Sequence, residues 1–338
     1  PQHPGAAHYL IHAYDDPVHA PLGLRPARVY AGIAPAAPHA LHMPSHIFFA
    51  LAKWDRGARS NVASFEAARS KAGGGADGLS GGGFHALHWL HYARLQQGRH
   101  ADARAVLDTT RHHAQTPATT TGYADYMRWY MPIAYVVGTE QWDRLDPLLE
   151  TMNVDPTALE PRAAVSVYAA RGLAAARQNN LSAAQTALQE AQSTLGDDPS
   201  DALRIQVLAL EGVVALRAGD TTAGLDHLQT ATELERERPL DYGPPFPVKP
   251  APELYGEALL SAGRPAEALD QFTATLERYP GRALSLWGKA TAAARADEPA
   301  AAQAARTALS EQWTGADPTV RDRLQSLSTA ATSSSDTQ

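Results

Sequence analysis

The sequence predicts an all-α solenoid in which antiparallel helical hairpins stack side by side. Three observations lead to this prediction. A short turn of small or polar residues recurs about every 40 residues, which is the period of a helix–turn–helix repeat. The segments between the turns carry apolar residues at helical spacing, as in Leu181, Ala184 and Leu188. Alternating runs rich in Val, Ile and Thr, which would indicate strands, are missing.

The recurring turns divide the chain into repeats. They lie at Lys53, Gly98, Gly138, Asn179, Gly219, Gly263 and Ala296, with spacings between 33 and 45 residues. The two longest spacings each contain an insertion, at 73–83 and 239–252. We therefore expect His-rich hairpins over 1–116, further repeats over 117–238, a Pro-rich crossover over 239–252, C-terminal repeats over 253–327 and a disordered tail over 328–338.

The composition excludes several classes of function. The net charge of −7 argues against nucleic-acid binding, because phosphate contacts need a basic surface. The chain has no cysteine, so disulfides, thiolate catalysis and Cys-containing zinc modules are excluded. No segment approaches the ~18 consecutive apolar residues of a membrane span.

Two segments resemble a known family. The segment 262–280, with Gly263 at the turn, Ala268 and Phe272 on the second helix and Pro280 at its end, resembles a tetratricopeptide repeat. The motifs HPGAAHYLIHAYD (3–15) and APHALHMPSHIF (37–48) resemble a family of bacterial tetratricopeptide-repeat proteins of unsettled activity. The resemblance implies an exported or periplasmic protein, of which this chain is the C-terminal part.

The apolar start of the chain, Ala6, Ala7, Leu10 and Ile11, has no repeat in front of it. End repeats of a solenoid need a polar outer face. If the chain is the C-terminal part of a longer protein, we therefore expect the first hairpin to show an exposed apolar flank or to pack on another chain.

Histidine is concentrated in the first third of the chain, where 13 of the 14 lie within residues 1–113. They form three groups at helical spacing: His8, His12 and Asp15; His39, His42 and His46; His85, His88 and Tyr92. Relative to the turns, each group falls on the first helix of a hairpin. First helices line the concave surface of such arrays. We therefore predict that three helices direct these side chains into one groove.

Imidazoles at this spacing suit a divalent transition metal, since two His at i and i+4 form a preformed pair of ligands. We expect Zn, Cu or Fe, or otherwise no cofactor, with His8, His12, His39, His42 and His46 as candidate ligands. Asp15 is a candidate ligand or orienting carboxylate. Tyr9 stands where the zincin helix has its catalytic Glu, so the motif is not that of a zincin. Candidates for a general base are Asp16, Glu66, Asp77 and Asp125.

A structural interpretation of the histidines stays open beside the metal site. They can form a polar network between repeats, with Tyr9, Trp89 and Tyr92 as partners. Pro44 removes a backbone hydrogen bond, so His39 and His42 can precede the helix that carries His46. We expect the histidines of the second helices, His100, His112 and His113, to be solvated.

Three other features border the same groove. Tyr123, Tyr126 and Tyr130 form a stripe that is either core or the wall of a pocket that binds a peptide. The glycine-rich run 73–83 is a flexible connector, or a lid over the groove. The segment 239–252 is an irregular crossover, with a proline-rich peptide ligand as the alternative.

These observations give three hypotheses for function. The first is a binding scaffold whose concave groove takes a peptide, a protein or a small molecule. The second is a metal-dependent hydrolytic or oxidative enzyme with an open coordination position in that groove. The third is a metal carrier with a closed site. The residues expected to bind are Tyr9, Asp15, His85, His88, Tyr92, Tyr123, Tyr126 and Tyr130.

Overall fold

The computed structural model describes residues 3–72, 78–116 and 122–332, and in these ranges the regular elements are all helical. Within the same ranges, no helix is long and apolar enough to cross a membrane. The helices form antiparallel hairpins, so the predicted all-α solenoid is confirmed.

The hairpins follow one another in chain order. They are α1 (Pro4–Ala13) with α2 (Ala20–Ile33), α3 (Pro38–His42) and α4 (Pro44–Ala50) with α5 (Trp54–Lys71), α6 (Gly81–Gln96) with α7 (His100–Ala114), α8 (Gly122–Thr139) with α9 (Leu145–Thr151), α10 (Pro161–Arg177) with α11 (Leu181–Leu195), α12 (Asp201–Arg217) with α13 (Thr221–Glu237), α14 (Ala251–Ser261) with α15 (Pro265–Arg278), and α16 (Ala283–Arg295) with α17 (Pro299–Gln312). Two 3-10 turns, 142–144 and 156–158, flank α9, and α18 (Pro318–Thr332) follows the last hairpin.

The turns form where the sequence predicts them, and their chemistry is local. Gly219 ends α12 with a φ of +92°, a conformation that a side chain would disfavour, and Asp220 then caps α13 by accepting from the amide of Ala223 at 3.0 Å. Between α10 and α11, Asn179 has a φ of +61°, and the side chain of Asn180 caps α11 by accepting from the amide of Ala183 at 3.1 Å. A left-handed residue followed by a capping side chain thus reverses the chain at each of these two turns.

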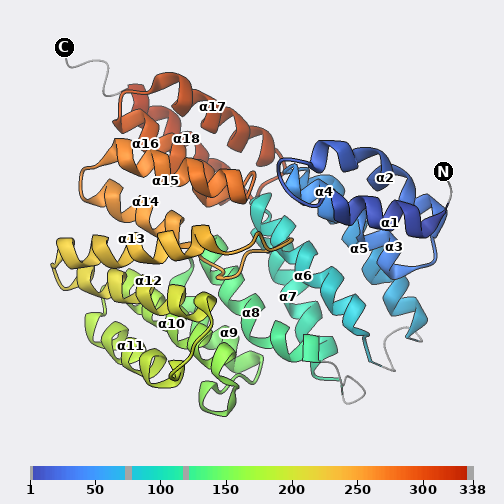
Figure 1. Ribbon diagram of the computed structural model, residues 1–338, viewed down its shortest axis with the longest axis horizontal. Helices are drawn as coiled ribbons and strands as arrows, with labels where there is room; N and C mark the ends of the chain where they lie inside the picture. Colours follow the sequence, from blue (N-terminus) through green and yellow to red (C-terminus); the bar gives the residue numbers. More distant parts are fainter. Residues whose placement is uncertain (1–2, 73–77, 117–121, 333–338) are drawn as a thin grey trace.

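The hairpins follow an arc that brings the C-terminal hairpin against the second and third hairpins (Figure 1). The first helices of successive hairpins contact one another, as α6 does α8 and α12 does α14. At the closing point the Trp54 indole donates to Gln312 at 2.9 Å, and the amide of Asp317 donates to the carbonyl of Gly98 at 3.0 Å. The closure joins the N-terminal hairpins to the C-terminal ones across more than 200 residues of sequence.

The Pro-rich segment between α13 and α14 runs into the middle of this arc (Figure 1). Its residues 244–250 are buried. The hydroxyl of Tyr130 donates to the carbonyl of Pro245 at 2.8 Å, and Phe246 packs against Trp129. Gly243 lies so close to Trp89 that an added Cβ would be 2.3 Å from the indole ring. The segment connects α13 with α14 without regular structure, and it packs against Trp129, Tyr130 and Trp89 inside the arc.

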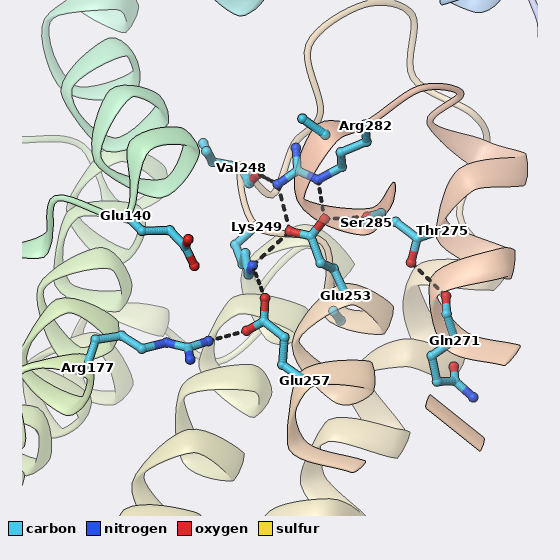
Figure 2. Close-up of polar contacts among 12 residues, drawn as sticks. Glu140, Arg177, Val248, Lys249, Glu253, Glu257, Gln271, Thr275, Arg282 and Ser285 are labelled. Atoms are coloured by element: carbon cyan, nitrogen blue, oxygen red, sulfur yellow. Dashed lines mark hydrogen bonds and ion pairs between the residues drawn. The ribbon is translucent and has the colours of Figure 1, made fainter. Parts of the chain in front are cut away.

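A buried ionic cluster fixes the end of that segment (Figure 2). Lys249 lies 2.8 Å from Glu253 and 2.5 Å from Glu257, while the Arg282 guanidinium makes two bonds to Glu253, at 2.7 and 2.9 Å. Arg282 also donates to the carbonyl of Val248 at 3.3 Å. Because each buried charge has an opposite partner, the cluster ties the segment to α14 and α16 without an uncompensated ion.

The structure differs from the sequence predictions at the glycine run, at the C-terminal tail and in part at the first hairpin. The glycine run does not extend to Gly83 as a connector, since α6 begins at Gly81 where Ser80 caps it; residues 73–77 lie outside the described residues. Residues 328–332 belong to α18 rather than to a disordered tail, and 333–338 lie outside the described residues. The apolar start of the chain is exposed only in part, since Leu10 is 45% exposed, as is Leu22 on α2 at 62%, whereas Ala7 and Ile11 are buried.

Candidate metal centre

Two short helices carry the second histidine group. Pro44 has no amide hydrogen, so the helix is interrupted at Met43, with His42 at the end of α3 and His46 on the first turn of α4. Met43 itself keeps helical angles, with φ −50° and ψ −37°, so the direction of the chain changes little. The break predicted from Pro44 is real. It nevertheless leaves His42 and His46 on one side, with their Nε2 atoms 3.0 Å apart.

His85, from α6, completes an inner group of three imidazoles. Its Nε2 lies 2.9 Å from Nε2 of His42, and ligating atoms of His42, His46 and His85 all lie within 4.8 Å of one another. His42 and His46 are buried and His85 is half-buried. The indole of Trp89 packs against the rings of His42 and His46, with centroids 4.9 and 4.4 Å away. We call His42, His46 and His85 the inner site.

Nδ1 of each inner-site ring, the nitrogen that faces away from the other two rings, has a hydrogen-bond partner. The Asn61 amide nitrogen donates to the carbonyl of Gly57 at 2.8 Å, which leaves its oxygen to face Nδ1 of His42 at 2.7 Å. Nδ1 of His42 must therefore carry the proton and donate it. Nδ1 of His46 contacts the Asp15 carboxylate, which can only accept when ionised, so this nitrogen is also protonated.

The Nε2 atoms of His42 and His46 consequently present lone pairs to each other across 3.0 Å. His85, whose Nδ1 is 2.7 Å from the Tyr123 hydroxyl, can donate one proton to His42. That proton still leaves the contact between His42 and His46 without a hydrogen. A shared cation resolves the contact, because three nitrogens at about 2.1 Å from a tetrahedral Zn²⁺ lie about 3.4 Å apart. The observed separations are a few tenths of an ångström shorter.

Burial disfavours the protonated form of His42 and of His85. Desolvation lowers the pKa of His42 well below its ordinary value, and neighbouring His46 and His85 add to the effect. Desolvation likewise lowers the pKa of His85 to about 4. A neutral ring offers a lone pair to a metal at neutral pH, whereas a protonated one does not. The inner site therefore suits a metal ion better than a trapped proton.

The remaining candidate ligands form an outer layer on α1 and α3. Nδ1 of His12 lies 4.0 Å from Oδ2 of the buried Asp15 carboxylate. The ligating atoms of His12, Asp15 and His46 lie within 4.8 Å of one another. Nε2 of His8 is 3.1 Å from Nε2 of His39. Three hairpins thus bring His8, His12, His39, His42, His46 and His85 together, as the helical spacing predicts.

The tyrosine stripe meets both the histidines and the Pro-rich segment. The Tyr123 hydroxyl lies 2.7 Å from Nδ1 of His85 and 2.9 Å from Nδ1 of His88. Nε2 of His88 is buried and has no hydrogen-bond partner among the described residues. Tyr126 and Tyr130 make edge-to-face contacts with His88, and the Tyr130 hydroxyl donates to the carbonyl of Pro245. Tyr130 is therefore part of the core, Tyr123 and Tyr126 pack against that core, and the stripe contacts a segment of the same chain.

Several predicted residues do not lie at the inner site. Tyr9 is 74% exposed, and Tyr92 is core, packed on Phe49 and Trp54. Of the candidate bases, Glu66 and Asp125 are exposed on other surfaces and Asp16 binds the exposed His19, while Asp77 lies outside the described residues. The expectation of a solvated His113 is wrong, because its ring is buried against Phe65 on the hairpin interface. His112 is exposed and His100 half-buried.

Two residues contact the histidines although no sequence pattern indicates that they do. Asn61 lies on α5, the second helix of its hairpin, where no spacing connects it with His42. Tyr242 lies on the Pro-rich segment, with its ring centroid 6.4 Å from His46 and 6.5 Å from His12. Tyr242, Asp15, Asp16 and His46 border a small cavity of about 40 Å³.

Comparison with solved structures finds helical-repeat proteins of low identity. A tetratricopeptide repeat protein from Parabacteroides merdae is 10% identical, with 86% of this chain and 98% of that chain covered and a TM-score of 0.44. The APC/C hetero-tetramer Cut9–Hcn1 is 14% identical, with 90% and 59% covered and a TM-score of 0.42. No protein-family model and no curated protein matches the chain. Similarity at this level carries no information on function.

Proposed function

We propose that the protein is a solenoid scaffold that holds a divalent transition metal, of the class of Zn²⁺, in its groove through Nε2 of His42, His46 and His85. The single observation that carries the proposal is the pair of facing lone pairs on His42 and His46. Asn61 and Asp15 hold the opposite nitrogens as donors, so neither ring can turn its proton inward without losing a buried hydrogen bond.

A purely structural network explains less of this geometry. Such a network needs an extra proton between His42 and His46, which would make one ring a buried imidazolium. Burial opposes that charge on His42, since it lowers the pKa of that ring. A metal ion has the same sign of charge, but direct bonds to three nitrogens replace its hydration shell. The donor set therefore favours a bound metal.

A metal-dependent enzyme is less well supported by the inner site. The cavity of about 40 Å³ borders His46 and Asp15, but neither His42 nor His85 lines it. It has room for a water molecule rather than for a substrate. The Pro-rich segment also takes up concave surface beside Tyr130, which reduces the space for a peptide partner there. We therefore favour a metal-holding role over catalysis at this position.

Elemental analysis of protein purified without a His tag tests the proposal. We expect stoichiometric metal in the wild type and its loss from the inner site in His42→Ala and His85→Ala. His112→Ala, which changes an exposed histidine away from the groove, is the matched control and retains the metal. Circular dichroism establishes that each variant is folded. Wild-type protein that stays metal-poor after equilibration with Zn²⁺ at neutral pH would refute the proposal.

A further inference from the structure

We infer that a second divalent cation binds beside the inner site, at an outer position between His12 and Asp15. This inference rests on the proposed inner metal site and extends it to a two-metal centre. The observations that carry it are a distance, a buried carboxylate and a set of neighbouring imidazoles.

The distance between His12 and Asp15 is the first observation. Nδ1 of His12 and Oδ2 of Asp15 are 4.0 Å apart, which is too long for a hydrogen bond. Two ligand atoms at about 2.1 Å from a tetrahedral ion lie about 3.4 Å apart, so a shift of about 0.6 Å by the partly exposed His12 brings the two atoms within reach of one ion. The two side chains are thus placed as ligands of one ion rather than as a bonded pair.

The surroundings of Asp15 are the second observation. Its side chain is only 3% exposed, and its ion-pair partners among the described residues are His12 and His46, without an Arg or a Lys. A buried carboxylate needs compensating positive charge, and a neutral histidine supplies only a hydrogen bond. A divalent cation at the outer position provides that charge. His46 then stands between the two ions, with Nε2 toward the inner site and Nδ1 toward Asp15.

Further nitrogen donors lie next to His12. His8, one helical turn earlier on α1, has its ring centroid 4.8 Å from that of His12. His8 in turn meets His39 from α3, with Nε2 atoms 3.1 Å apart. His12 is 41% exposed in its side chain, whereas the inner-site rings of His42 and His46 are buried. The outer ion is therefore open to solvent, and we expect it to exchange more readily than the inner one.

Equilibrium dialysis of chelator-treated, tag-free protein against Zn²⁺, followed by elemental analysis, tests the inference. We expect about two zinc ions per wild-type chain, as in other two-metal sites. His12→Ala retains about one ion, because the inner ligands are untouched, and its exposed position makes misfolding a minor concern. His85→Ala removes the inner ion. His19→Ala is the matched control, because His19 is another exposed histidine bonded to an aspartate, Asp16, at 2.8 Å.

The outcomes separate this inference from the proposed function. A wild type that saturates at one ion, with no change in His12→Ala, overturns the outer site and leaves the inner site standing. Loss of an ion from His19→Ala as well as from His12→Ala shows adventitious binding to surface histidines and also overturns it. A wild type that binds no zinc overturns both proposals.

Discussion

Asn61→Leu tests the tautomer argument on which the inner metal site depends. The Asn61 oxygen accepts from Nδ1 of His42 at 2.7 Å and is oriented by the bond from its own amide to the carbonyl of Gly57. Without it, the His42 ring is free to move its proton to Nε2, where it blocks the ligating lone pair. Partners that orient metal ligands in this way typically account for 10–100-fold in affinity. We therefore expect zinc affinity to fall by about 10–100-fold, or about 1.4–2.8 kcal/mol.

The assay is competition for Zn²⁺ with a chromophoric chelator, with tag-free wild type and variant measured in parallel. Ser64→Ala is the matched control, because Ser64 lies on the same helix, is 1% exposed and donates to the carbonyl of Pro38 at 2.8 Å without contacting an imidazole. It removes one buried hydrogen bond near the site and leaves the tautomer of His42 unchanged. Unchanged zinc affinity in Asn61→Leu, or an equal loss in both variants, refutes the reasoning.

Three further predictions concern the fold. Burial lowers the pKa of His91 to about 3, so the unfolded chain, with an ordinary value near 6.5, binds the proton first as the pH falls. Between pH 7.5 and 5, the metal-free wild type should therefore lose about 2 kcal/mol more of its free energy of unfolding than His91→Leu loses, as measured by urea unfolding. An identical pH profile in the two proteins contradicts this. Glu253→Gln leaves the buried Arg282 without its carboxylate and should cost about 3–5 kcal/mol in the same assay, and a loss below about 1 kcal/mol would show that the cluster is not needed. Gly243→Ala places a methyl group against an indole at a φ of +85°, whereas Gly263→Ala has a φ of +74° and open space around the new methyl group. The first substitution should therefore lower the free energy of unfolding by about 1–3 kcal/mol more than the second. Equal losses would show that the segment around Gly243 can shift at no cost.

The sequence predicts the repeat architecture because its signals are local. A left-handed Gly219 followed by the capping Asp220 needs no information from elsewhere in the chain, and the apolar stripe of each helix has a fixed period. The grouping of His8, His42 and His85 follows from the same reasoning, since first helices of successive hairpins share a face. Spacing therefore predicts which histidines meet, although it does not predict which of their atoms do.

Contacts between distant segments could not be predicted in this way. Asn61 orients His42 from the opposite helix of the hairpin, and Tyr242 reaches the histidines from a segment about 200 residues later. The local sequence around Pro245 predicts only a connector, because nothing in it indicates that the Tyr130 hydroxyl donates a hydrogen bond to the Pro245 carbonyl. His113 reads as a surface residue on an amphipathic helix, and only the packing of the adjacent hairpin shows that it is buried.

The closure of the arc changes how the chain can unfold. In an open array of repeats each unit contacts only its neighbours, so end repeats fray independently and stability rises with repeat number. Here the amide of Asp317 binds the carbonyl of Gly98, and the Trp313 indole binds the carbonyl of Gln96 at 3.1 Å. The last helices are therefore held by the third hairpin as well as by the one before them. Because these contacts span more than 200 residues, the ring closes late in folding, and its two ends should protect each other from local opening.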